Sequence, residues 1–493
     1  MYEKRRKMIL LGFLLSVFLF FLLFYTASHP ILPSDMDDWA YMYPRRLAVP
    51  IWKTWNPIRV FAEVAMPAVS VFSSIVFMPV TGNIFSAMMI GYALCMAAGM
   101  TALLYGLCIV LRRKQYTFLQ TLFWACFFLL SHFWIFRTQY QGNDYMLRTG
   151  DACTYFFYVI PNLLNATAVL WLEADPDLGS LHPLGSYLKK SLFLLLAYFC
   201  IFSNIWAGMI LAAYIGSILI FHVASAIRGK KSFQTWFSEN SLYLLLLAGW
   251  LVSQVFELNG MRAHEILEEQ NYADNVIKTL NMIPGLLKAM NRRYAFTIGV
   301  LFAGGFIALL RAKDRATMRT VSIWGLASVF GALYLVLSCS KVAPNYIRRP
   351  DVFYGLFFFC SVIVILAGGA MIRKISFVKL FLPIVLMIIL SDCSSPGRTW
   401  MECNGHGMST RIVNNINNDI VKQLKEAEQN GLDSTVIFVP DFEVEDNGLY
   451  HIKATEIVGE TMWKLGVLER NIIVDRIVPS KDKNILLHTG PDR

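Results

Sequence analysis

The sequence predicts a mainly α-helical bundle that crosses a membrane many times and carries a small α/β unit at its C-terminal end. Of its 493 residues, 56% are hydrophobic and only 16% are charged, and the mean hydropathy is +0.50. A soluble core cannot hide that much apolar surface. The apolar residues occur in runs long enough to cross a bilayer, and these runs stop after Leu390, where a polar tail begins.

The first apolar run, from Met8 to Ala27, has the length of one span and lacks the small-residue cleavage site of a signal peptide. We expect it to remain as the first membrane helix. The run at 190–222 is too long for one span, so we expect a turn near Ser203 and Asn204 to divide it. About eleven spans result. The other spans are expected at 84–111, 116–136, 154–172, 241–257, 294–310, 319–339, 352–372 and 375–391.

The basic residues predict the orientation, because cytoplasmic loops are enriched in Lys and Arg. The N-terminal run KRRK at 4–7 places the N-terminus inside the cell. With about eleven spans, the later basic clusters also fall inside, and the C-terminal tail falls outside. These clusters follow the spans that end near Leu111, Phe221, Leu310 and Ile372. They account for much of the net charge of +10, so no nucleic acid partner is expected.

Two long segments and a tail are expected on the outer face. Residues 28–83 mix Pro and Trp with apolar stretches, which suits one or two helices in the membrane interface. Residues 258–293 indicate a helical pair broken at Pro284. The tail predicts a helix ending at Gly431, a strand at 434–440, a helix at 451–466 and a strand at 470–478. We therefore divide the chain into a membrane domain, 1–391, and an extracytoplasmic α/β domain, 392–493.

Cysteine usage leaves one question open in this tail. Cys393 and Cys403 both lie in its first part, where an oxidising compartment allows a disulfide. Their spacing alone cannot decide whether they pair.

The stretch SDMDDWAYMYPRRL, residues 34–47, follows the first span on the outer side and is dense in reactive side chains. Asp37 or Asp38 can serve as a general base for an acceptor hydroxyl, and Asp35 is a third choice. Carboxylates can also hold a divalent cation such as Mg²⁺ or Mn²⁺, although the pattern specifies no metal and we commit to no cofactor. The plainer alternative is that adjacent acids mark a helix start, where the helix dipole favours them.

Arg348 and Arg349 lie on a short outer loop, where the bias of basic residues toward the cytoplasm predicts few cations. Paired arginines suit bidentate contact with phosphate oxygens, and the alternative is an anchor to lipid headgroups. Further candidates for this phosphate site are Lys341, Arg45 and Arg46. Candidates for contacts with the rest of a substrate are Trp39, Tyr346, Asp144, Arg148, Asp151 and His264.

These segments resemble the GT-C class of membrane glycosyltransferases, multi-span enzymes that use polyprenyl-phosphate sugars and carry an acidic motif in the first outer loop. The resemblance rests on DMDDW at 35–39, RTGDACTYFFYVIPN at 148–162 and APNYIRRPDVFYG at 343–355. The last is similar to the arginine-bearing loop of bacterial GtrII-like glucosyltransferases.

The resemblance implies an inverting sugar transfer at the outer face of a bacterial cell membrane. The donor is a polyprenyl-phosphate sugar among the membrane lipids, and the acceptor is an extracytoplasmic glycan, lipid or cell-wall polymer. Asp37 or Asp38 is then the base, and Arg348 and Arg349 contact the donor phosphate. A polysaccharide ligase or polymerase remains an alternative, as does a lipid or sugar transporter or flippase. Against transport, charged residues are scarce at the span centres.

Overall fold

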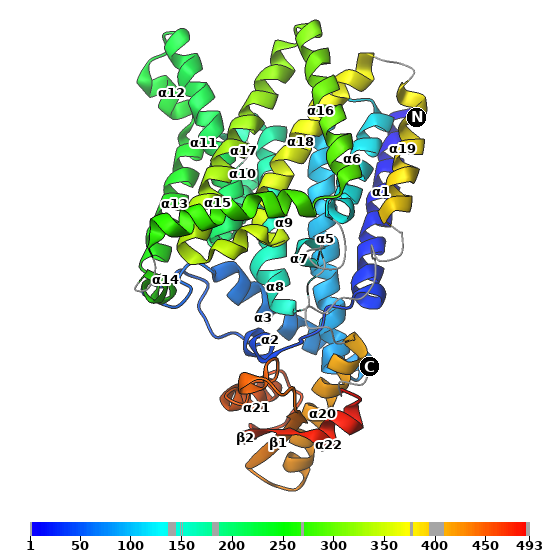
Figure 1. Cartoon of the computed structure of the whole chain (residues 1–493), viewed down its shortest axis with the longest axis vertical. Coiled ribbons are helices and arrows are strands. Elements are labelled where there is room, and N and C mark those ends of the chain that lie inside the picture. Colours follow the sequence, from blue (N-terminus) through cyan, green and yellow to red (C-terminus); the bar gives the residue numbers. More distant parts are fainter. Residues whose placement is uncertain are drawn as a thin grey trace.

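The computed structural model is a bundle of long helices with a small α/β unit at one end (Figure 1). It describes residues 2–136, 144–147, 149, 151–179, 187–267, 271–374, 378–393 and 409–489. The basic clusters lie at the end of the bundle that carries the N-terminus and α12 (Phe233–Glu239). We call the opposite end the outer end, following the orientation that these clusters predict.

Eight helices of the described residues are long and apolar enough to cross a membrane, which agrees with a polytopic membrane protein. They are α1 (Tyr2–Leu23), α8 and α9 (Ala152–Thr154 and Ile160–Ala174, one continuous segment), α5 (Ile84–Arg113), α11 (Ile205–Arg228), α13 (Ser241–Leu258), α16 (Arg292–Ala312), α17 (Arg315–Val342) and α18 (Pro350–Lys374). Shorter helices accompany them: α6 (Phe118–Trp134), α7 (Asp144–Leu147), α10 (Tyr187–Ile201) and α19 (Val378–Cys393). The total of about eleven spans stays a prediction.

Polar side chains determine where several of these helices begin, because the first backbone N–H groups of a helix have no partner within it. Asn83 caps α5 by accepting from the N–H of Ser86 at 2.9 Å. Asn204 caps α11 by accepting from the N–H of Trp206 at 2.9 Å. The predicted division of the 190–222 run is therefore confirmed, since α10 ends at Ile201 and α11 begins after this cap.

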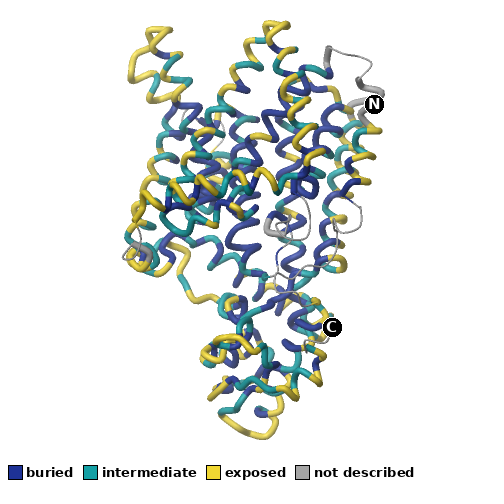
Figure 2. Tube along the Cα trace, viewed as in Figure 1, coloured by how far each residue is buried: buried dark blue, intermediate teal, exposed yellow. Residues whose placement is uncertain are grey.

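The interior of the bundle is apolar, and its lipid-facing side is apolar as well. In Figure 2 the central helices are largely buried, whereas the outer surfaces of helices such as α16 are exposed. Phe296 of α16 has 73% of its surface exposed. Gly305 lets α16 approach the backbone of α18 at Ala367 so closely that a Cβ atom would clash there. Such close contact between helices is a common basis of association within a bilayer.

The first outer segment contains three short helices, α2 (Met36–Tyr41), α3 (Val60–Val76) and α4 (Met78–Thr81). Asp35 caps α2 by accepting from the N–H of Asp38 at 2.8 Å. α3 packs along α5, where Ser70 bonds the hydroxyl of Tyr92 at 2.6 Å. The segment is therefore helical, with three helices where one or two are expected, and their location in the membrane interface stays a prediction.

The second outer segment corrects a prediction. It contains α14 (Met261–Leu267) and α15 (Tyr272–Ala289), and Pro284 lies inside α15 instead of breaking it. Proline removes one helical hydrogen bond, which leaves the carbonyl of Leu280 without its donor. Leu280 is 47% exposed, so this part of α15 lies at the surface of the bundle and not in its packed interior. The packing of α15 on α17 and on the 344–348 turn holds the helix in place.

The C-terminal segment forms the α/β unit in Figure 1. Its elements are α20 (Thr410–Gln429), β1 (Ser434–Pro440), α21 (Thr455–Lys464), β2 (Ile473–Ser480) and α22 (Lys481–Leu487). The two strands pair in parallel, with α20 packed on β1 and α21 on β2. Gly431 ends the first helix with φ +73, a conformation that favours glycine. The possible Cys393–Cys403 pair falls partly outside the described residues.

Candidate functional site

Asp38 is the fully buried member of the acidic loop, with 0% of its surface exposed. Its Oδ2 accepts from the N–H of Ser34 at 2.7 Å and of Ala152 at 3.1 Å. Its Oδ1 accepts from the N–H of Cys153 at 2.6 Å. Asp38 therefore fastens α2 to the N-terminus of α8, where free N–H groups and the helix dipole attract a carboxylate. This position argues against its predicted role as a base, because the carboxylate is fully buried and both of its oxygens already accept from backbone N–H groups.

Two more carboxylates lie close to Asp38 and also cap helices. Asp35 accepts from the N–H of Asp38, and Asp151 accepts from the N–H of Thr154 at 2.5 Å. Burial, followed by the charge of Asp151, raises the pKa of Asp38 to about 7, although the N–H groups of Ser34 and Cys153 lower it. Burial, followed by the charges of Asp38 and Asp151, raises the pKa of Asp35. Asp35 and Asp151 are thus occupied in holding the loop together.

Asp37 differs from its neighbours because it is exposed. It lies in the first turn of α2, one helical turn before Tyr41. The ring of Tyr41 packs edge-on against Phe157 with centroids 5.0 Å apart, and the guanidinium of Arg59 lies 5.4 Å from the same Phe157 ring. Asp37 is the only one of the three predicted aspartates that can meet a substrate without rearrangement of the loop.

Two predicted site residues instead hold the outer segments together: Trp39, predicted to contact the substrate, and Arg46, predicted to contact the donor phosphate. Trp39 is fully buried beneath the C-terminal segment, where its indole donates to Asn417 at 3.4 Å. Arg46 donates to Glu63 at 2.9 Å and to the carbonyl of Pro57 at 2.6 Å. These contacts correct both predictions, because the polar atoms involved face protein groups.

Arg45 is also predicted to contact the donor phosphate, and the structure gives it a protein partner. It lies 3.9 Å from Glu460 of α21 in a partly exposed ion pair. An exposed pair of this kind contributes little to stability.

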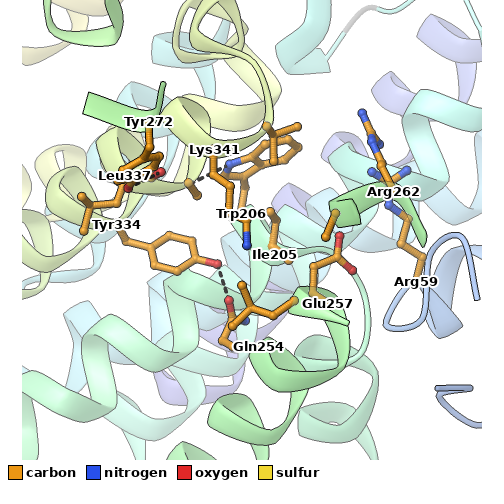
Figure 3. A pocket seen from close by; sticks show the side chains of 14 residues that line it. Arg59, Ile205, Trp206, Gln254, Glu257, Arg262, Tyr272, Tyr334, Leu337 and Lys341 are labelled. Atoms are coloured by element: carbon orange, nitrogen blue, oxygen red, sulfur yellow. Dashed lines mark hydrogen bonds between the residues drawn. The ribbon is translucent and has the colours of Figure 1, made fainter. Parts of the chain in front are cut away.

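A cavity of about 280 Å³ lies at the outer end, where α11, α13, α14 and α17 converge beside the start of α3 (Figure 3). Its polar lining is dominated by Arg59, Arg262, Lys341, Glu257 and Gln254. Its apolar and aromatic lining consists of Ile205, Trp206, Leu258, Ala263, Tyr272, Tyr334, Leu337 and Val342, and Ser338 completes the wall.

Three cations and one anion face this cavity. Arg262 donates to the hydroxyl of Tyr346 at 3.4 Å. Among the described residues, Lys341 makes no hydrogen bond or ion pair, and no carboxylate lies within ion-pair distance of Arg59 or Arg262. Glu257 interacts electrostatically with all three cations without a close ion pair. The lining therefore carries an excess of positive charge in a partly apolar setting, where an anion is attracted more strongly than in water.

The predicted arginine pair lies beside this cavity but does not line it. Arg349 forms an ion pair with Asp351 at 2.5 Å and lies 4.8 Å from the ring of Tyr158. The guanidinium of Arg59, which does line the cavity, lies 5.6 Å from the same Tyr158 ring. Arg348 is exposed, and its guanidinium lies against Gly285 of α15.

Tyr346, a predicted substrate contact, lies between the arginine loop and the cavity. Its hydroxyl accepts from Arg262 at 3.4 Å, and its ring is 5.2 Å from the guanidinium of Arg349. It also packs on Trp206, with ring centroids 5.5 Å apart. Tyr346 therefore lies between the cavity residues Arg262 and Trp206 and the arginine loop.

The acidic loop and the arginine loop contact the same helical segment, 152–174, at different positions along its axis. Asp38 binds its start at Ala152, and Arg349 covers Tyr158, six residues later. This separation is roughly 9 Å along a helix axis. None of the predicted aspartates lines the cavity. The two loops thus border a common region without facing one another across one pocket.

The remaining predicted residues add little to the site. His264 is exposed on α14 and does not line the cavity, although its neighbours Arg262 and Ala263 do. Arg148 and the side chain of Asp144 lie outside the described residues. Among the described side chains, no group of three or more His, Cys, Asp or Glu residues is arranged to hold a metal.

Sequence reasoning missed Arg59, Arg262 and Glu257. Glu257 carried a usable signal, because a carboxylate at the edge of an apolar span is costly and commonly functional. Arg59 and Arg262 carried none, since isolated arginines in outer segments are ordinary. No family model, curated protein or solved structure matches the chain.

Proposed function

We propose that the chain is a membrane glycosyltransferase that takes a sugar from a polyprenyl-phosphate carrier and transfers it to an extracytoplasmic acceptor. The observation that carries this proposal is the cavity with Arg59, Arg262 and Lys341 at the outer ends of the helices. Cations of this kind suit phosphate oxygens, and Arg offers a planar set of donors for them.

The surroundings of the cavity suit a lipid carrier. Leu258 and Leu337 line it and are 49% and 52% exposed, so its wall reaches the apolar outer surface of the bundle. Leu251 and Val255 continue that surface along α13 and are also about half exposed. A prenyl chain that lies along this face would place its phosphate at the cations, because the apolar surface of α13 leads to the cavity and the cations line the cavity itself.

Asp37 is the base in this proposal. The proton of the acceptor hydroxyl passes to the Asp37 carboxylate while the acceptor oxygen bonds to the anomeric carbon of the sugar. The bond from that carbon to the phosphate oxygen breaks, and its electron pair leaves with the polyprenyl phosphate. Arg59 lies between the phosphate site and the helix that carries the base. It lines the cavity, and its guanidinium also contacts the ring of Phe157, against which Tyr41 of α2 packs. The cations stabilise the negative charge that develops on the leaving phosphate.

The experiment is a donor-consumption assay in membranes, with a radiolabelled polyprenyl-phosphate hexose and release of polyprenyl phosphate as the readout. Asp37→Asn is expected to lower the rate by about 10²- to 10⁴-fold, the usual contribution of a general base. Asp482→Asn is the matched control, because Asp482 is also exposed in the first turn of a helix.

Equal rates for wild type and Asp37→Asn, at equal expression, would remove Asp37 from the mechanism. Movement of the intact labelled lipid across proteoliposome membranes without loss of its sugar would instead favour a flippase.

A further inference from the structure

One oxygen of the cavity carboxylate lacks a donor. The Oε2 atom of Glu257 is buried, and no described group donates a hydrogen bond to it. Leaving a buried charged acceptor without a donor is costly, so such an atom in a cavity calls for a partner from outside the chain. The cations explain why the site tolerates the charge, but they do not supply this hydrogen bond, because none forms an ion pair with Glu257.

The uncharged polar groups Gln254, Trp206 and Ser338 of the lining have partners within the chain. The Oε1 of Gln254 accepts from the hydroxyl of Tyr334 at 2.6 Å, and its amide donates to Ser253 at 3.3 Å. The indole of Trp206 donates to Ser338 at 3.0 Å. Figure 3 shows Glu257 between this partnered set and the cations Arg59 and Arg262. A ligand that fits the lining must therefore bring an anion for the cations and, next to it, a hydrogen-bond donor for Glu257.

The volume of the cavity limits the size of that ligand. At about 280 Å³ it lies at the lower limit of ordinary small-molecule pockets, which begin near 300 Å³. A single sugar ring with its phosphate fits a volume of this size. A sugar 1-phosphate combines the required groups, because its ring hydroxyls are donors a few bonds from the phosphate oxygens.

We infer that Glu257 is a specificity-determining residue that accepts a hydrogen bond from a hydroxyl of the donor sugar, and that the cavity takes one monosaccharide phosphate unit. This inference rests on the proposed function, since it assigns the ligand of the same cavity. Glu257 binds the sugar, whereas Lys341, Arg59 and Arg262 bind the phosphate. The two sets of residues can therefore be separated by experiment.

The experiment measures binding of three lipids to the purified full chain in detergent micelles: decaprenyl phosphate, decaprenyl-phosphate glucose and phosphatidylethanolamine. The variants are Glu257→Gln, Glu257→Asp and Lys341→Gln. Glu265→Gln is the control, because Glu265 is an exposed glutamate of α14 outside the cavity lining. Each variant is measured with the same three lipids. The quantity compared is the ratio of its affinity for decaprenyl-phosphate glucose to its affinity for decaprenyl phosphate.

We expect wild type and Glu265→Gln to bind the sugar lipid more tightly than decaprenyl phosphate. Glu257→Gln should lose about tenfold in sugar-lipid affinity while keeping or improving its affinity for decaprenyl phosphate, because a negative charge has gone. Glu257→Asp should recover part of the preference. Lys341→Gln should weaken both prenyl lipids by the same factor, because they share the phosphate.

Three results would overturn the inference. If Glu257→Gln binds both prenyl lipids as wild type does, Glu257 does not read the sugar, although the proposed function stands. If phosphatidylethanolamine binds with the same affinity as the sugar lipid, the group that donates a hydrogen bond to Glu257 is a headgroup amine and not a sugar hydroxyl. If wild type binds neither prenyl lipid, the proposed function fails and the inference fails with it.

Discussion

Replacing Asp38 by alanine tests whether this carboxylate holds the outer loop together. The substitution removes both oxygens, so the N–H groups of Ser34, Ala152 and Cys153 all lose their acceptor inside a fully buried site. An unsatisfied buried group costs about 1–3 kcal/mol. Three such groups, with some water entering the space left by the side chain, predict a loss of about 3–5 kcal/mol.

Asparagine at the same position should cost about half as much. Its one oxygen can stay at the Oδ2 position and keep the bonds to Ser34 and Ala152. Its NH₂ group then faces the N–H of Cys153, where the wild-type Oδ1 accepts at 2.6 Å. One lost bond and one donor-to-donor contact correspond to about 2 kcal/mol.

The assay is thermal unfolding of the purified chain in detergent, followed by tryptophan fluorescence at about pH 8, above the pKa of Asp38. We expect a midpoint at least about 5 °C below wild type for Asp38→Ala, and a smaller decrease for Asp38→Asn. Asp37→Asn is the control and should unfold as wild type does, because Asp37 is exposed. A midpoint for Asp38→Ala within about 1 °C of wild type would refute the proposed role of these three bonds.

Two further predictions concern the same region. Trp39→Ala removes a fully buried ring against Phe85 and Asn417, which should weaken docking of the C-terminal segment by about 3–5 kcal/mol. Limited proteolysis should then release a C-terminal fragment faster than from wild type or from Trp463→Ala, whose ring is 42% exposed; equal rates would contradict this. Asp38 also predicts a pH dependence, since its pKa is about 7 when folded and about 3.9 when unfolded. Its contribution to stability is complete below about pH 4 and is lost as the pH rises through 7, so the midpoint should be higher at pH 5.5 than at pH 8. An unchanged pH dependence in Asp38→Asn would assign the effect to another group.

The sequence was sufficient to predict features that depend on local pattern. The apolar runs predicted the long helices, and the turn at Asn204 followed from length and charge. Gly431 marked a helix end because the backbone there requires positive φ. Pro284 misled because the packing of α15 on α17 and on the 344–348 turn keeps the helix continuous, and no local pattern reports that packing.

The candidate site was predictable only in outline. Asp37 and Asp38 are adjacent, and on a helix adjacent side chains point about 100° apart, so one is exposed and the other is buried. Only packing against α8 decides which is which. The unexpected arginines at 348–349 lie beside the cavity but do not line it. The cavity itself, however, joins Arg59, Glu257 and Lys341, which come from three distant parts of the chain.

The contact between the acidic loop and the C-terminal segment has a consequence for synthesis. Trp39 donates to Asn417 across 378 residues of sequence, and Asn417 donates to the carbonyl of Pro33 across 384. At a translation rate of about 5–20 residues per second, α2 waits roughly 20–75 s for the residues that cover it. During that interval Trp39 lacks its contact with Asn417, and so does the backbone that precedes the turn with Asp37. A chain that ends before residue 417 therefore lacks the bonding partner of Trp39 and of the Pro33 carbonyl, and its acidic loop is incomplete.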